Sequence, residues 1–168
     1  MSEGKNERKN ETSICDYKVD VEMINIGKIC EYAGKSVHIA IEAMLNTIHD
    51  ILSAFKINKY VIVRFDPNAY DAPLRVSFFF TKALEDEWGK EKIKEFKVNF
   101  YENAMNYFAK IKNIPNTNLL EAELLAVDQT LHCLADAYGF DAIFVIIYGQ
   151  NTNEKDAYKT AWLLVKKS

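Results

Sequence analysis

A row of ionisable side chains recurs at helical spacing in the second half of the chain. Asp128, His132 and Asp136 follow one another four residues apart, and Glu121 lies two turns earlier on the same stripe. Residues at this spacing share one face of an α-helix. A carboxylate there could hold the imidazole in one tautomer and make it a general base. The alternative is that the row is the solvated side of an amphipathic helix, because such a helix always has a polar face.

Metal binding is not predicted for this row. The sequence has only three histidines, and no recognised ligand motif accompanies His132. His49 and Glu42 are a similar pair on an earlier segment, seven residues apart, and they are interpreted as surface residues beside an apolar stripe. No cofactor is predicted, because the six glycines are scattered singly and form no phosphate-binding loop.

Two arginines lie in a predicted β-hairpin. Segments 59–66 and 74–82 are rich in β-branched and aromatic residues, and the stretch between them contains two prolines and an asparagine. Lysine accounts for nearly all other basic residues outside the polar start of the chain. The arginines Arg64 and Arg75 therefore stand out, since a guanidinium binds carboxylate or phosphate with a geometry that lysine does not reproduce.

The register of this hairpin decides whether its polar residues lie together. If Phe65 pairs with Val76, then Arg64 lies opposite Ser77 and Asp66 opposite Arg75. Directly opposite residues share a face of the sheet, so these four residues are predicted to form a binding surface for an anionic ligand or a carboxylate. The alternative is a cross-strand ion pair between Asp66 and Arg75 on a solvated face.

Composition bounds the class of protein. The 168 residues carry a formal net charge of −3 with a sequence pI near 5.7, so nucleic-acid binding is not expected. We expect a polar, disordered tail over residues 1–13 and a single domain over 14–168. The start of the chain lacks the apolar stretch of a signal peptide and no run could span a membrane, which predicts a cytoplasmic protein. The thiols of Cys15, Cys30 and Cys133 are expected to be reduced.

The hydrophobic pattern predicts an α+β fold. Its sheet, antiparallel or mixed, would combine two hairpins with an N-terminal strand and pack against two long helices, in the order β-α-β-β-α-α-β-β. Residues 36–42 fit either a helix or a strand. The predicted elements are a strand from about residue 17 to 23, a short helix over 25–30, a helix ending near 55, the hairpin of 59–66 and 74–82, helices over 90–113 and 119–138, and a second hairpin of 141–150 and 157–166.

The arrangement of a hairpin, two helices and a hairpin resembles the order of elements in the tunnelling-fold enzymes, which handle pterins and purines. The resemblance is one of order alone, because neither the metal-binding histidines nor the purine-anchoring glutamate of those families aligns with this sequence. Order does not assign a family or transfer a function.

Three functions are compatible with these features. The main prediction is a binding module, oligomeric through its aromatic surface, that recognises a protein partner or a small anionic ligand through a hairpin face. One alternative is a small enzyme acting on a nucleotide-like or pterin-like substrate at a subunit interface. It would require Glu121, Asp128 or His132 to meet Arg64 or Arg75 in one pocket. The other alternative is a counter-defence or immunity-type protein that neutralises a macromolecule.

Overall fold

The computed structural model describes residues 20–25, 37–68, 73–147 and 158–166. The order of its elements agrees with the predicted one and confirms an α+β fold. The predicted tail over 1–13 and the predicted short helix that follows Asn25 and ends at Gly34 lie outside the described residues. The elements are β1 (Asp20–Asn25), α3 (Val37–Ala54), β2 (Lys59–Phe65), β3 (Val76–Phe80), α4 (Lys82–Ile111), α5 (Leu119–Ala137), β4 (Ala142–Ile147) and β5 (Thr160–Lys166), with a 3-10 turn over Pro73–Arg75 before β3.

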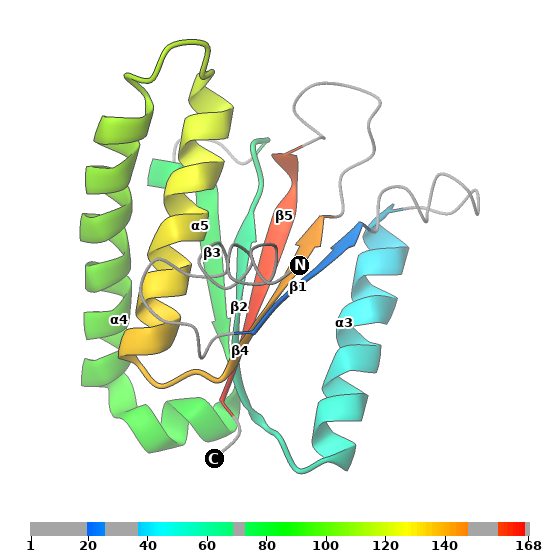
Figure 1. Ribbon diagram of the computed structural model, residues 1–168. Helices are drawn as coiled ribbons and strands as arrows, with labels where there is room; N and C mark the ends of the chain where they lie inside the picture. The colour runs from blue at the N-terminus through cyan, green and yellow to red at the C-terminus, as the bar shows by residue number, and fades with distance from the viewer. Residues whose placement is uncertain (1–19, 26–36, 69–72, 148–157, 167–168) are drawn as a thin grey trace, which may run out of the picture.

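The strands form one mixed five-stranded sheet in the order β1-β4-β5-β2-β3 (Figure 1). β1 runs parallel to β4, and every other neighbouring pair is antiparallel. Phe65 pairs with Val76 and Arg64 with Ser77, so the predicted register of the β2/β3 hairpin is confirmed. The second predicted hairpin is also present as β4 and β5, which lie inside the sheet as the two-sided apolar pattern of residues 141–150 indicates.

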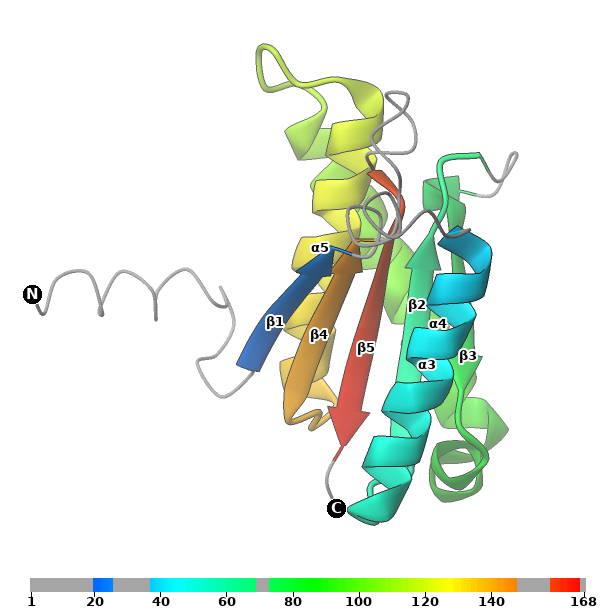
Figure 2. The ribbon, with the colours of Figure 1, turned by 90° about the vertical axis from the view of Figure 1, so that its right-hand side faces the viewer.

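Helices cover the two faces of the sheet unequally. α4 and α5 pack side by side on one face, and of the described helices α3 lies on the other (Figures 1 and 2). The α4/α5 face holds the larger core, in which Phe96 and Phe100 of α4 are fully buried. Phe78 of β3 packs edge-on against both rings, with centroids 6.1 and 5.1 Å away. This aromatic packing fixes α4 against the β2/β3 hairpin.

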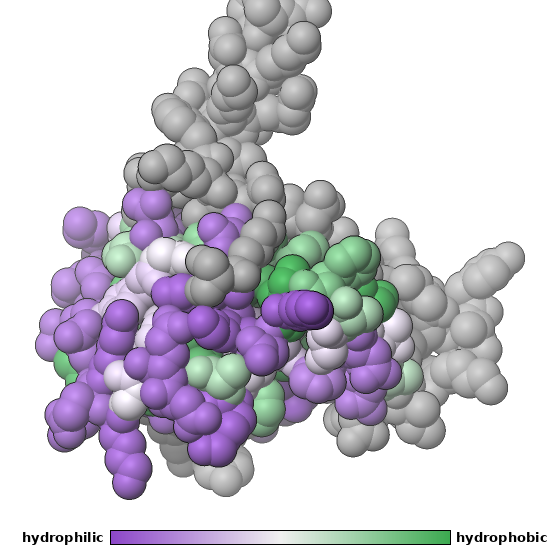
Figure 3. Space-filling model, turned by 90° about the horizontal axis from the view of Figure 1, so that it is seen from below, coloured by the Kyte–Doolittle hydropathy of each residue, from purple (hydrophilic) through white to green (hydrophobic). Residues whose placement is uncertain are grey.

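On the α3 face, the described side chains form a smaller core. Tyr60, Leu163 and Val165 of the sheet are buried there, and Ile48 and Leu52 of α3 pack against them only partly buried. The end of α3 leaves apolar side chains in solvent, since Ile51 is 51% exposed and Phe55 just beyond the helix is 74% exposed. Hydrophobic colours gather on the side of the molecule where α3 ends, whereas the α4 side is hydrophilic (Figure 3).

Local sequence signals explain the bounds of the later helices. Asn118 caps α5, because its side chain accepts a hydrogen bond from the Glu121 N–H at 2.8 Å. Gly139 ends the helix with φ +76°, as predicted. α4 differs from the prediction, since it starts at Lys82 and not near residue 90. It is broken at Gly89, whose φ of 76° and ψ of 167° are not helical, and the predicted helix is the part after this break.

An ion-paired group joins the start of α4 to the sheet. Lys59 and Lys166 pair directly across β2 and β5, and like charges at such positions repel. Glu87 contacts both lysines, with Lys166 Nζ 3.2 Å from its carboxylate. The hydrogen bond from Lys59, and to a smaller extent the one from Lys166, lowers the pKa of the Glu87 carboxyl. One carboxylate thus offsets the repulsion between the two cations.

Candidate functional site

The four hairpin residues predicted to bind a ligand do not share one face of the sheet. Val63 and Phe65 belong to the core under α4 and α5, so Arg64 between them lies on the α3 face with its cross-strand partner Ser77. Arg75 instead forms an ion pair with Glu123 of α5, on the opposite face. The prediction that Arg64 and Arg75 lie together was therefore wrong.

Backbone conformation explains the different direction of Arg75. Leu74 and Arg75 have φ of 60° and 51°, in the left-handed region. The alternation of side chains between the two faces, on which the prediction rested, therefore does not extend to Arg75, which precedes Val76. The backbone pairing does extend to it, since the Asp66 N–H donates to the Arg75 carbonyl at 3.1 Å. Asp66 does not pair with Arg75 through its side chain, which instead accepts from the Asn68 N–H at 2.9 Å.

The Arg75 guanidinium already has protein partners. It lies 3.4 Å from the Glu123 carboxylate and donates to the carbonyl of Pro67 at 2.7 Å. Glu123 is 8% exposed, and burial raises the pKa of its carboxyl while Arg75 opposes that rise. The pair fastens the loop before β3 to α5, so its described contacts are those of a structural ion pair.

Two members of the predicted row on α5 do lie together. Asp128 accepts a hydrogen bond from the indole N–H of Trp162 on β5 at 3.0 Å. His132 Nε2 lies 3.7 Å from the same carboxylate oxygen, which is beyond hydrogen-bonding distance. Glu121 is at the start of the helix, where its backbone is capped by Asn118, and Asp136 is half-buried one turn beyond His132. The helix thus brings Asp128 next to His132, as its spacing predicts.

The chemistry of this pair is limited by its burial. His132 Nε2 is buried and has no hydrogen-bond partner, and the same is true of Thr130 Oγ1 on the same helix. The Asp128 carboxylate also accepts the hydrogen bond from Trp162, a residue that is 1% exposed. Within the described residues, no three histidine, cysteine or acidic groups are placed to hold a metal ion. Arg64 lies on the α3 face of the sheet, and Arg75 pairs with Glu123 and the Pro67 carbonyl, so the described contacts do not join either arginine to this pair.

Two other residues singled out in the sequence have structural contacts. His49 Nδ1 hydrogen-bonds to the hydroxyl of Tyr60 and so joins α3 to β2; the side chain of Glu42 lies outside what the structure describes. Cys133 lies 3.6 Å from the Tyr107 hydroxyl and is disulfide-bonded. The prediction of a reduced thiol was therefore wrong at Cys133, and the other two cysteines, Cys15 and Cys30, lie outside the described residues.

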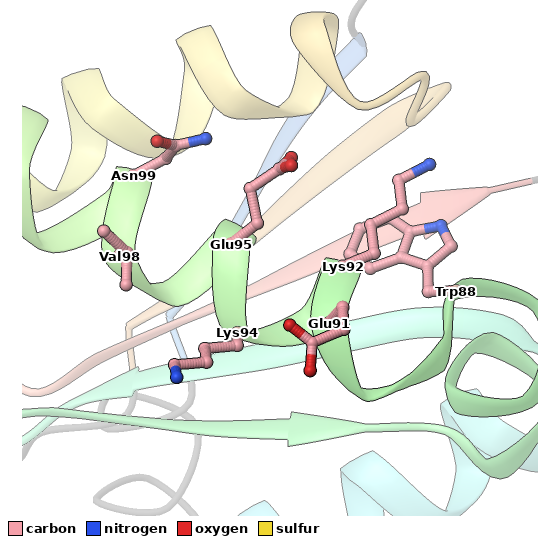
Figure 4. A pocket seen from close by; sticks show the side chains of 7 residues that line it. All are labelled: Trp88, Glu91, Lys92, Lys94, Glu95, Val98 and Asn99. Atoms are coloured by element: carbon pink, nitrogen blue, oxygen red, sulfur yellow. The ribbon is translucent and has the colours of Figure 1, made fainter.

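A shallow hollow of about 610 Å³ lies on α4 beyond the Gly89 break. Lys92 stacks over the ring of Trp88, with Nζ 5.1 Å from its centroid, and Glu95 accepts from the Tyr138 hydroxyl at 2.7 Å. Glu95, Lys92 and Asn99 point toward α5, whereas Lys94 and Val98 point away from it (Figure 4). The hollow is lined by Trp88, Glu91, Lys92, Lys94, Glu95, Val98 and Asn99. Its polar groups of mixed charge do not converge on a single point.

No family model matches the chain, and neither a curated protein nor a solved structure is similar to it. None of the helices in the described ranges is long and apolar enough to cross a membrane. Function must therefore be argued from the residues alone.

The surface most suited to a partner is the outer edge of the sheet at β3. β3 is the last strand in the sheet order, and its five residues, VSFFF, include no charge and no proline. Phe79 is 58% exposed on the α3 face, while Phe78 on the other face contacts Tyr101 of α4, with ring centroids 6.1 Å apart. At the other edge of the sheet, β1 contains Asp20 and Glu22. Charged residues discourage pairing at an edge strand, and β3 has none.

The alternation of backbone hydrogen bonds along an antiparallel strand shows which N–H and C=O groups of β3 point away from β2. The Arg75 carbonyl and the Thr81 N–H both bond to β2, so the backbone groups of Ser77 and Phe79 point to β2 as well. Those of Val76, Phe78 and Phe80 therefore point away from the sheet. The described hydrogen bonds include no backbone partner for these outward groups. Sequence reasoning found the hairpin but missed this edge, because strand order was left open.

Proposed function

We propose that the chain is a protein-binding module whose partner adds an extended segment to the outer edge of β3. The observation that carries the proposal is an uncharged edge strand with outward backbone groups and an aromatic side chain, Phe79, that is 58% exposed. Strand addition draws affinity from main-chain hydrogen bonds and specificity from alternate side chains. This refines the prediction of binding through a hairpin face.

The separation of the other candidate groups favours binding over catalysis. Arg75 is paired with Glu123 on one face, Arg64 lies on the other, and Asp128 is bonded to Trp162. The enzyme alternative needed these groups in one pocket. The alternative of a small anionic ligand held by two arginines loses its support for the same reason. Oligomerisation and a cytoplasmic location stay predictions.

The proposal can be tested with a library of random displayed peptides selected against the folded chain. Selected peptides should bind the wild type and lose affinity for Phe79→Asp, because the new charge lies at the pairing edge. Leu119→Asp is the matched control, since Leu119 is an exposed apolar residue, 64% exposed, at the start of α5. Its peptide affinity should equal that of the wild type. Equal binding to the two variants would overturn the proposal.

Amide exchange in the wild type gives a second readout that needs no variant. On peptide binding, the N–H groups of Val76, Phe78 and Phe80 should gain protection, because they would become hydrogen-bonded. Those of Ser77 and Phe79 should change little, since they already point to β2. Protection that spreads evenly over the strand, or lies only elsewhere, would contradict strand addition.

A further inference from the structure

One flank of α4 beside β3 carries a continuous row of basic and aromatic or apolar side chains. Lys97 Nζ lies 5.6 Å from the ring centroid of Phe80, and Tyr101 contacts Phe78. Both contacts place this flank of the helix over β3. At spacings of three and four residues the row is Lys90, Lys94, Lys97, Tyr101, Met105 and Phe108.

The row contains cations without paired carboxylates. Lys90, Lys94 and Lys97 are exposed, and the ion pairs among the described residues do not include them. Lys94 points away from α5 (Figure 4). Glu91 lines the same hollow as Lys94, and the ion pairs among the described residues do not join the two. The acidic Glu95 is directed to the other flank, where it accepts from Tyr138.

The apolar part of the row is also exposed. Met105 is 45% exposed on α4, and Tyr101 one turn before it is half-buried against Phe78. The edge of β3 is therefore bordered on the α4 side by Lys97 and Tyr101, and on the α3 side by Phe79. A strand added there would place alternate side chains next to each border.

We propose that the segment that binds at β3 is an acidic, amphipathic strand, with carboxylates on its α4 side and apolar side chains against Phe79. This inference rests on the strand addition proposed above and states the chemistry of the partner. Complementary charge across an interface favours the correct partner and speeds the encounter. Lys97 contacts Phe80 of β3, and Lys94 lies three residues before it in the same row, so these two cations are the ones to test.

A second copy of the chain fits this edge less well. Two β3 strands paired about a two-fold axis would place the same flank of α4 from each copy on one side of the joined sheet. Lys94 and Lys97 would then face the same lysines of the other copy, and like charges at such an interface are unfavourable. Nucleic acid is anionic too, but its phosphates offer no alternating apolar side chains for Phe79.

The test uses labelled synthetic peptides of about eight residues, alternating glutamate with valine, and matched peptides with serine or lysine in place of glutamate. Fluorescence anisotropy should give the tightest binding for the glutamate peptide and the weakest for the lysine peptide. The affinity of the glutamate peptide should fall between about 50 mM and about 300 mM salt, because exposed charges are screened.

Paired variants locate the effect on one flank of α4. Lys94→Gln combined with Lys97→Gln should weaken binding of the glutamate peptide roughly fivefold, the sum expected of two exposed ion pairs. The control combines Lys92→Gln with Lys110→Gln, which removes the same charge elsewhere on α4 and should leave affinity unchanged. Both double variants should fold, because all four lysines are exposed.

The possible failures are distinguishable. Equal binding of the serine and glutamate peptides would overturn the acidic partner and leave strand addition in place. A lack of binding by every peptide, together with no selected library sequence, would overturn both proposals. Tighter binding of an oligothymidine of about 16 nucleotides than of the glutamate peptide would replace the protein partner with nucleic acid. A dimer in native mass spectrometry that Phe79→Asp dissociates would replace it with a second copy.

Discussion

Among the described side chains, the face of the sheet under α4 and α5 buries a connected aromatic core, whereas the described core under α3 is a smaller group of residues. Phe96 and Phe100 are fully buried on the first face, and on the second Phe55 is left 74% exposed beside the partly buried Leu52. Among the described side chains, the larger buried cluster therefore lies on the first face. β3 belongs to both, with Phe78 in the core and Phe79 in solvent, so its edge can carry binding without loss of the core.

The sharpest test of this comparison truncates one phenylalanine on each face. Phe96→Ala should lower the free energy of unfolding by about 3 to 5 kcal/mol, because it removes a fully buried ring. Phe79→Ala should change it by less than about 0.5 kcal/mol, since surface substitutions have small effects. Urea denaturation of both variants measures the difference. Similar losses for the two would show that the α3 face carries as much stability as the other.

A second test concerns the polar contact between α5 and β5 on the packed face. Trp162→Phe removes the indole N–H that donates to the half-buried Asp128 carboxylate. The free energy of unfolding should fall by about 1 to 3 kcal/mol, because the carboxylate loses this hydrogen bond. A double-mutant cycle with Asp128→Ala separates the hydrogen bond from the lost ring volume. Strictly additive losses would mean that the contact does not stabilise the packed face.

A third test compares two positions on α3. Leu52→Ala should cost about 1 to 2 kcal/mol, less than a fully buried leucine, because its side chain is only partly buried against the sheet. Ile51→Ala should cost less than about 0.5 kcal/mol, since Ile51 is 51% exposed. Chemical denaturation of the two variants measures how much of the helix contributes. A larger loss for Ile51→Ala would show that this side chain is covered in solution.

The smallest expected effect is a pH dependence at the Arg75 and Glu123 pair. Burial raises the folded-state pKa of the Glu123 carboxyl above its ordinary value of 4.5, and Arg75 opposes that rise. The folded state then binds more protons than the unfolded state, so this contribution is complete below pH 4.5 and is lost as the pH rises through the raised pKa. The stability advantage of wild type over Glu123→Gln should therefore shrink with rising pH. An advantage that grows with pH would mean that Arg75 outweighs the effect of burial.

Local patterns allowed much of the fold to be predicted. The β2/β3 register followed from alternating apolar residues, and both ends of α5 followed from Asn118 and Gly139, because capping depends on residues next to the helix end. The neighbouring positions of Asp128 and His132 followed from helical spacing. Residues 37–42, which fitted two patterns, are helical in the structure, a choice that local alternation could not make.

Contacts between distant segments could not be predicted in this way. Two such contacts are the parallel pairing of β1 with β4 and the hydrogen bond between Trp162 and Asp128. The hydrophobic pattern of one segment does not indicate which distant segment it will contact. The direction of Arg75 depended on positive φ at two residues that are not glycine. The start of α4 was missed because Gly89 reads as a helix stop, although Leu84 and Trp88 before it are spaced as one buried helical face.

The strand order has a consequence for synthesis of the chain. β4 and β5, the last strands to leave the ribosome, separate β1 from β2 in the sheet. β1 cannot pair until β4 has been synthesised, because Asp20 pairs with Ala142. One side of β2 has no neighbouring strand until β5 has been synthesised. The two hairpins, β2 with β3 and α4 with α5, are local enough to form first, while the long-range pairing forms last. A nascent chain would therefore expose the sheet-facing sides of its early elements until β5 has been synthesised, and release of a chain truncated before β5 should yield an aggregating product.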